Sequence, residues 1–400
     1  MASPAVDGAR PAWRVVWAAF VVAMFGWGVG FYGPGVYLAA LHRSHDWSIA
    51  TISLAITAHF LLSAVLITAL PEAYRRFGAA PVTIGGAVCT AAGAIAWTNA
   101  SQIWLLVPAL LLSGVGWSAM SGAALNLIVA PWFERDRPKA ISMAFNGASI
   151  GGLLFTPLWT TLIVHVGLAA AGLAVALATL AVVCPLAWVI LRRAPPRAAA
   201  QVAPPLPRRA LLGQSRFLTM SAAFALGLFV QIGLFAHLIA RLEPAFGATI
   251  AALAISLATL CAVLGRGLLG WLLGEHDRRL AAGANLLVQA AGTLLLAFGE
   301  GMAPLALGCV LFGLGVGNLT SLPPLIAQRE FRPADVGTVV ALVTAINQAV
   351  FAFAPRHFRR IARCCRRLYR GIPGGRRASG RCCRHRRPES PLFLRRFNVL

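Results

Sequence analysis

The chain has 400 residues, of which 58% are hydrophobic and 12% are charged, and its formal net charge at pH 7 is +23. This composition excludes a soluble globular domain of ordinary type and indicates a polytopic membrane protein. The positive charge does not indicate nucleic-acid binding, because fifteen of the 35 basic residues lie after Pro355 and most of the others lie in short segments between apolar stretches. No basic groove interleaved with aromatic residues is available to bind a nucleic acid.

Eleven apolar stretches follow one another along the chain, and each is long enough, or nearly so, to cross a hydrocarbon core of about 30 Å as a helix. They are residues 15–41, 49–70, 81–97, 103–130, 140–164, 167–191, 217–240, 249–273, 280–298, 304–327 and 336–354. The first is too long for the core of a signal peptide, so we interpret it as a retained span. One residue within the eleven stretches carries a formal charge, Arg266.

The distribution of basic residues predicts a cytoplasmic N-terminus, since cytoplasmic loops carry an excess of Lys and Arg. In that orientation only Arg43 and Arg241 lie on the outer side. The basic residues on the cytoplasmic side are Arg10, Arg14, Arg75, Arg76, Arg135, Arg137, Lys139, Arg192, Arg193, Arg197, Arg208, Arg209, Arg216, Arg278, Arg279, Arg329 and Arg332. We therefore expect a multi-pass protein of the inner membrane with its N-terminus in the cytoplasm.

The composition changes at Pro355, where the eleventh stretch ends in mid-pattern and an Arg-rich segment with two Cys-Cys pairs begins. In a GC-rich gene, leucine codons read one base out of frame encode cysteine, and alanine codons encode arginine. We interpret residues 355–400 as the disordered product of a shifted frame, and expect a twelfth span to be missing. Adjacent cysteines lack the spacing of zinc ligands, so no metal site is predicted. A lipid-binding polybasic tail is the other alternative, but it would emerge on the outer side.

Two halves are predicted, joined by a Pro-rich basic linker. Residues 1–192 are expected to form an N-terminal six-helix bundle, 193–216 the cytoplasmic linker, and 217–354 an incomplete C-terminal bundle of five spans. The halves repeat three features in the same order: LSGVGWSA (112–119) and LFGLGVGN (311–318), an Arg-Pro pair after spans four and ten, and an Arg pair after spans two and eight. Duplicated halves are the layout that transporters use for alternating access.

The chain resembles the major facilitator superfamily over residues 13–354, and within it the branch of monocarboxylate porters and oxalate/formate exchangers. The most specific segment is WFERDRPKA (132–140) followed by NGASIG (146–151), which is similar to the branch's entry into helix five. FGWG (25–28) in helix one and Trp47-Ser48 at the start of helix two also resemble this branch. The resemblance implies an all-α membrane fold of two six-helix bundles, with eleven spans visible here.

The superfamily's loop motif is degenerate in both halves. After helix two, Arg75 stands where an aspartate is usual and is followed by Arg76; the second copy keeps Asp277 and Arg278. The resemblance implies that these four residues act in gating loops.

Arg266 is the main candidate for substrate binding. It lies seven residues before Leu273, roughly 10 Å along the helix axis, so one interpretation is an anchor arginine that reaches the inner interface. We favour a cavity arginine that binds a substrate carboxylate, because a charge facing lipid is costly and no acidic residue within a span could neutralise it. The resemblance supports this, because helix eight of monocarboxylate porters carries a substrate-binding arginine. Their aspartate four residues earlier, associated with proton coupling, is replaced here by Ala262.

Other polar residues at mid-span are weaker candidates. Tyr32, Gln231 and Asn318 fall near the centres of spans one, seven and ten, which line the cavity in this superfamily; each is also explained as a hydrogen-bonding residue between helices. His59 and His237 are the candidate proton carriers. No nucleotide-binding loop, metal triad or nucleophile–base pair is present, so no enzyme activity and no cofactor are predicted.

The sequence thus predicts a monomeric secondary transporter that moves a small organic anion, a monocarboxylate or dicarboxylate, by alternating access. Two alternatives stay open. One is an efflux carrier for hydrophobic compounds, which should tolerate the loss of Arg266. The other is a non-transporting truncated product or a membrane sensor, although no sensory output domain is visible.

Overall fold

The computed structural model describes residues 10–193, 205–274, 276–299 and 301–353, except for several side chains between 236 and 252. Within these ranges the chain is helical between short connections and contains no strand. The predicted tail, residues 355–400, lies outside the described residues, as do residues 194–204 of the predicted linker.

The first six spans are built from helices and short π or 3-10 segments. Span one joins α1, a π-helical segment and α2, and span four joins α6 and α7. The elements are α1 (Arg10–Phe25), η1 (Gly26–Phe31), α2 (Gly33–His45), α3 (Ile49–Ile67), α4 (Leu70–Phe77), α5 (Ala79–Thr98), η2 (Ile103–Leu105), α6 (Leu106–Ala119), α7 (Gly122–Val129), η3 (Ala130–Trp132), α8 (Arg137–Val166), α9 (Leu168–Leu186) and η4 (Ala187–Leu191).

The later spans follow the short helix α10 (Arg208–Leu212). The long element α11 (Ser215–Leu272) contains spans seven and eight as two arms, separated at Gly247, whose φ of 82° interrupts the helix. Span ten is divided at Gly317. The remaining elements are α12 (Arg278–Phe298), α13 (Met302–Val316), α14 (Asn318–Glu330) and α15 (Pro333–Phe351).

All eleven predicted spans are confirmed as helices long and apolar enough to cross a membrane, with ends that differ by a few residues from the apolar stretches. The largest difference is in span one, which runs over Arg10–His45 rather than 15–41. The helix continues into flanking polar residues because its backbone hydrogen bonds do not depend on side-chain polarity. The all-α fold class is therefore confirmed for the described part.

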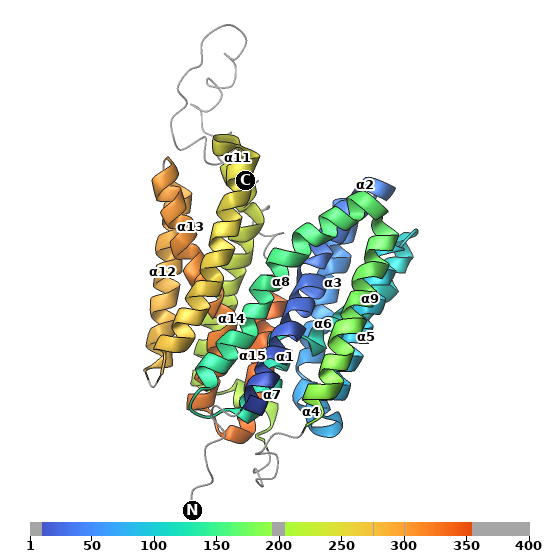
Figure 1. Cartoon of the computed structure of the whole chain (residues 1–400). Helices are drawn as coiled ribbons and strands as arrows, with labels where there is room; N and C mark the ends of the chain where they lie inside the picture. Colours follow the sequence, from blue (N-terminus) through green and yellow to red (C-terminus); the bar gives the residue numbers. More distant parts are fainter. Residues whose placement is uncertain (1–9, 194–204, 275, 300, 354–400) are drawn as a thin grey trace, which may run out of the picture.

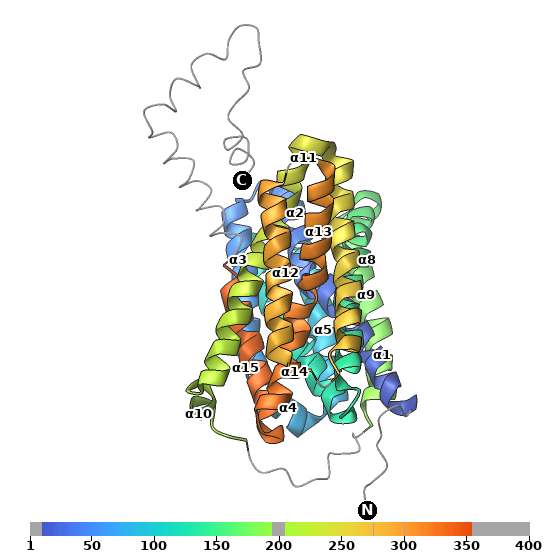
Figure 2. The ribbon, with the colours of Figure 1, turned by 90° about the vertical axis from the view of Figure 1, so that its left-hand side faces the viewer.

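The helices form two groups that follow chain order. Figure 1 shows α1 to α9 on one side and α11 to α13 on the other, with α14 and α15 between them toward the end that carries the N-terminus. In the orthogonal view α12 and α13 lie between the two arms of α11 (Figure 2). The two groups lie close together at the end of α4 and α10 and diverge toward the end of α2.

Close helix packing in the first half depends on glycines. A Cβ on Gly147 or Gly151 of α8 would lie 2.0 or 2.3 Å from a backbone oxygen of α1. In the π segment, a Cβ on Gly28 would lie 2.3 Å from the ring of Phe155. Small residues let membrane helices approach until dispersion contacts stabilise the pair. The Gly-x-x-x-Gly spacing on α8 therefore fixes how α8 packs on α1.

The two glycine-rich repeats pack in equivalent ways in the two halves. A Cβ on Gly114 would approach the carbonyl oxygen of His59 in span two. In the second half, a Cβ on Gly313 would approach the carbonyl oxygen of Ala258 in span eight. Likewise, Gly116 contacts Thr90 of span three and Gly315 contacts Gln289 of span nine. The repeated sequence thus corresponds to a repeated three-helix contact, as expected for duplicated halves.

Candidate functional site

Arg266 lies on the second arm of α11, and its side chain is 3% exposed. It extends between the halves, with α13 and α14 on its own side and α8 on the other. It is therefore enclosed by protein, whereas the head group of an anchor residue would be exposed.

The guanidinium binds oxygen atoms from both halves. Nε donates to the carbonyl oxygen of Gly317 at 3.0 Å. Nη1 donates across the interface to the carbonyl oxygen of Phe145 at 2.5 Å, with Asn146 Oδ1 at 3.3 Å and Ser149 Oγ at 3.2 Å. Every one of these acceptors is uncharged, so none of its hydrogen-bond partners in the described part neutralises the cation.

Nη2 is the least satisfied part of this guanidinium. Its hydrogen-bond partner in the described part is Thr320 Oγ1, at 3.5 Å. A guanidinium has five N–H donors in a planar fork, two of them on Nη2. Nη2 therefore has N–H donor capacity that its one long hydrogen bond among the described residues does not use.

The local sequence explains how the arginine fits. The carbonyl oxygen of Gly317, which lies between α13 and α14, accepts from the side chains of both Arg266 and Thr320. A Cβ on Gly317 would lie 2.9 Å from Cζ and Nε of Arg266. On α11, a Cβ on Gly265 would lie 2.1 Å from the carbonyl oxygen of Leu314. Glycine is required at both positions because the helices meet around a large planar side chain.

Tyr32 is the predicted site residue that the structure places near Arg266. Its ring covers Gly152 of α8, where a Cβ would lie 2.6 Å from the ring. Asn146, Ser149 and Gly152 are spaced by three residues, so they follow one face of α8. The first two contact Arg266 and the third contacts Tyr32, which is 37% exposed. One face of α8 thus connects the two side chains.

Gln231 and Asn318 are buried within the second half, where each binds an amide on α12. The Gln231 side-chain oxygen accepts from Gln289 at 3.0 Å, and Asn318 donates to Asn285 at 2.8 Å. Asn318 follows Gly317 directly, yet its side chain turns toward α12 rather than toward Arg266. In this structure the two residues connect helices of one half, and they do not contact the guanidinium.

His59 is fully buried in the first half. Its Nδ1 lies 2.8 Å from Ser113 Oγ, which also accepts from Trp97 Nε1 at 3.0 Å. None of the hydrogen bonds of His59 reaches the surroundings of Arg266. The side chain of His237 lies outside the described residues.

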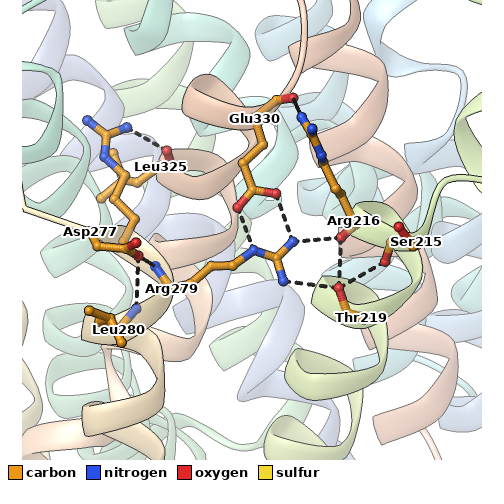
Figure 3. A network of polar contacts seen from close by, with 9 residues as sticks. Ser215, Arg216, Thr219, Asp277, Arg279, Leu280, Leu325 and Glu330 are labelled. Atoms are coloured by element: carbon orange, nitrogen blue, oxygen red, sulfur yellow. Dashed lines mark hydrogen bonds and ion pairs between the residues drawn. The ribbon is translucent and has the colours of Figure 1, made fainter.

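Asp277 and Arg278 stabilise helix ends in the second half. The Asp277 carboxylate caps α12 by accepting from the backbone N–H groups of Arg279 and Leu280 at 2.7 and 3.0 Å. Arg278 donates to the carbonyl oxygen of Leu325 in α14 at 2.5 Å. Next to them, Arg279 makes a two-bond ion pair with Glu330 and also donates to Arg216 and Thr219 (Figure 3). These contacts join α11, α12 and α14 at one end of the molecule.

Arg75 and Arg76 of α4 have only local contacts among those described. Arg75 pairs with Glu72 of the same helix, and Arg76 lies over the ring of Phe77 at 5.2 Å. Both side chains are exposed at the end of the molecule that carries α10. Exposed pairs of this kind contribute little to stability.

A second polar contact between the halves is centred on Gln348 of α15. Its side-chain oxygen accepts from Trp117 Nε1 at 2.7 Å, and its side-chain nitrogen donates to the carbonyl oxygen of Phe60 at 2.9 Å and to Ser63. Sequence analysis did not identify this residue. An amide within an apolar span was the available signal, but the sequence does not show which helix such an amide faces.

The guanidinium of Arg266 offers N–H donors of the kind that an anion accepts. No group of three His, Cys, Asp or Glu residues that could hold a metal is present among the described residues. A carboxylate suits a buried guanidinium, because its two oxygens can accept two parallel N–H bonds from the planar fork.

Comparisons with known proteins agree with this architecture. Residues 16–355 match the family model described as Major Facilitator Superfamily. The MFS transporter asaE of Aspergillus flavus is 29% identical over 164 residues, which are 40% of this chain and 37% of that protein. The crystal structure of the human organic anion transporter MFSD10 (TETRAN) is similar with a TM-score of 0.70 and 18% identity, over 97% of this chain and 99% of that chain. At that identity the structural likeness concerns the fold alone.

We predict that Gln348→Leu destabilises the contact between the halves. It leaves Trp117 Nε1 without its acceptor in a buried place, which costs roughly 1–3 kcal/mol, whereas Ser63 Oγ and the Phe60 carbonyl oxygen keep their hydrogen bond to each other. Thermal unfolding of the purified protein in detergent should show a lower midpoint. The matched control is Gln102→Leu, since Gln102 also accepts from a tryptophan N–H, that of Trp104, but at an exposed position where water replaces the lost partner. Equal midpoints for both variants would contradict the prediction.

Proposed function

This chain belongs to the major facilitator superfamily of transporters, and from that premise we propose that it carries a small organic anion, a monocarboxylate or a dicarboxylate, by alternating access. The substrate carboxylate binds Arg266 in this proposal. Tyr32 completes the site, and Gln231 and Asn318 are secondary candidates that would have to leave their present partners.

The observation that carries the proposal is the buried, unneutralised guanidinium between the halves. Burying a cation costs several kcal/mol unless a counter-charge compensates it. The uncharged acceptors around Arg266 compensate only in part, and Nη2 has a single long hydrogen bond. An anionic substrate supplies the missing charge, and no acidic side chain within the described hydrogen-bond network does so.

The position of Arg266 also links binding to movement. The arginine belongs to the second half, whereas Phe145, Asn146 and Ser149 belong to the first. Rocking of the halves would break these three hydrogen bonds. A carboxylate that takes over the Nη1 and Nη2 donors offsets this loss, so the substrate changes the free-energy difference between the two states.

Orientation and location in the inner membrane are part of the same proposal. The N-terminal end, α4 and α10 lie at one end of the molecule (Figure 2), and these carry cytoplasmic basic residues in the N-in orientation. The halves are close together at that end, so the structure corresponds to a state closed toward the cytoplasm. A monomer suffices, because both halves come from one chain.

Resemblance to the monocarboxylate branch supports an anionic substrate, and the structural neighbour is described as an organic anion transporter. The coupling mechanism differs from that of the branch, because Ala262 replaces its aspartate on helix eight. His59 and His237 stay candidates for proton transfer. His59 would act through Ser113 within the first half rather than at Arg266.

An efflux carrier for hydrophobic compounds is the second candidate, and an aromatic cluster favours it. Phe31 and Phe60 of the first half pack against Phe351 of the second, with ring centroids 5.9 and 5.8 Å apart, and Phe31 also packs against Trp117 at 5.7 Å. Such rings could bind an apolar substrate between the halves. Transport of organic anions would require Arg266, whereas efflux of hydrophobic compounds would not.

The tail forms a further part of the proposal. Family similarity ends at residue 355, where the composition changes. We expect resequencing across the Pro355 codon to reveal a frame that continues α15 and encodes a twelfth apolar span. A confirmed Arg-rich tail together with full transport activity would overturn this expectation.

The central prediction is that organic anions are transported and that Arg266 binds them. Proteoliposomes containing the 400-residue chain, or its frame-restored form, should take up at least one member of a panel of monocarboxylates and dicarboxylates. Arg266→Lys keeps the charge but loses the fork geometry, which should reduce kcat/KM by about ten- to a hundredfold. Transport of neutral compounds alone, undiminished in Arg266→Ala, would support the efflux carrier instead.

We also predict that Gly317→Ala impairs transport while Arg266 is retained. The added methyl group would meet the guanidinium at 2.9 Å and displace it from its acceptors. Misplacement of a binding group on this scale costs up to a hundredfold in rate, and we expect a loss of about tenfold. Gly283→Ala on α12 is the control, because a Cβ there has open space. Equal uptake rates for the two variants would show that the position of the guanidinium does not matter.

A further inference from the structure

A groove of about 260 Å³ opens between the two halves at the end of the molecule that carries the N-terminus. Its walls come from α1, α8 and the second arm of α11. The residues that line it are Trp13, Trp17, Lys139, Ser142, Met143, Asn146, Gly267 and Trp271. The proposed function does not use it.

The groove faces the membrane rather than the interior of the bundle. Trp17 is 53% exposed and Trp271 is 69% exposed, and both project from spans. Lys139 is the third residue of α8, and Trp271 is the last residue but one of α11. The wide end of the groove therefore lies at the level where tryptophan and lysine concentrate in membrane proteins, between headgroups and acyl chains.

Its depth follows from helix geometry. Asn146 lies nine residues after the first residue of α8, which is about 14 Å along the axis. At this inner end Asn146 contacts Arg266, and a Cβ on Gly267 would have nothing within 4 Å. The groove thus runs from the interface into the hydrocarbon region. Its volume is below the 300–1,000 Å³ typical of pockets that enclose a whole ligand, so it suits one part of a larger amphipathic molecule.

Charge at the wide end is predominantly positive. Lys139 lines the groove and is paired with Asp136 at 3.2 Å. Arg10 and Arg14 alternate with Trp13 and Trp17 at helical spacing on α1, and both arginines are exposed. Three basic residues therefore stand beside one acidic partner. Juxtamembrane basic residues attract anionic lipids of the cytoplasmic leaflet by about 1 kcal/mol each.

We propose that this groove binds an anionic phospholipid of the cytoplasmic leaflet. The phosphate group lies near Lys139, Arg10 and Arg14, and one acyl chain packs along the tryptophans toward Gly267. Because α1 and α8 belong to one half and α11 to the other, the lipid bridges the halves and stabilises the state closed at this end. The site is independent of the substrate, so failure of the anion-transport proposal would leave it standing.

The test uses the full chain in nanodiscs and measures quenching of tryptophan fluorescence by lipids with brominated acyl chains. Phosphatidylglycerol and phosphatidylcholine carrying the same brominated chains are compared at equal mole fraction. We expect stronger quenching by phosphatidylglycerol. The excess should fall in Lys139→Gln, which removes charge, and disappear in Gly267→Leu, which fills the groove and retains every basic residue.

Controls separate the groove from other lipid contacts. The double variant Trp17→Phe and Trp271→Phe should remove most of the excess. Trp188→Phe should leave it unchanged, although Trp188 is also exposed and has Arg192 over its ring at 5.9 Å. Equal quenching by the two lipids in the unmodified chain overturns the proposal, because the groove then shows no preference for negative charge. An excess that persists in Gly267→Leu also overturns it, since the lipid then lies elsewhere.

Discussion

One buried cation constrains the centre of this molecule. Arg266 has no charged partner in its described hydrogen-bond network, so the protein must surround it with oxygen atoms, and those atoms come from both halves. This requirement explains the glycine at 317, whose carbonyl oxygen accepts from Nε, and the polar residues on one face of α8. Neutral acceptors only partly compensate a guanidinium in a low-dielectric interior. The anionic substrate proposed above would supply the charge that these acceptors lack.

Small residues make this arrangement possible elsewhere in the bundle. Gly114 and Gly116 in the first half make the same kinds of contact as Gly313 and Gly315 in the second. Similar backbone contacts in both halves give two rigid units of similar construction. Among the described residues, polar side chains join the halves at Arg266, at Gln348 and between Gln328 and Asn126. In the proposed mechanism, rocking would exchange such hydrogen bonds and leave the packing within each half intact.

Asn146 belongs to two sites at once. Its side-chain oxygen accepts from Arg266, and the residue also closes the inner end of the groove that faces the lipid. A single turn of α8 thus separates the proposed substrate contact from the proposed lipid. Both ligands would carry negative charge, and both would lie between α8 and the second arm of α11. A change in the relative position of α8 and the second arm of α11 would therefore change both proposed binding sites.

The sequence by itself determined the eleven spans and the all-helical fold, and it singled out Arg266 as the one charged residue within the apolar stretches. Apolar length and the cost of a charge in hydrocarbon are properties of the residues themselves. It also indicated the repeat, since equivalent glycines stand in equivalent segments. Only the tertiary structure decided what each polar residue contacts. Asn146, Ser149 and Gln348 turned out to join the halves, whereas Gln231 and Asn318 bind amides on α12. The physical reason is rotational: when a span is apolar on all sides, its sequence does not show which face meets another helix, the cavity or lipid.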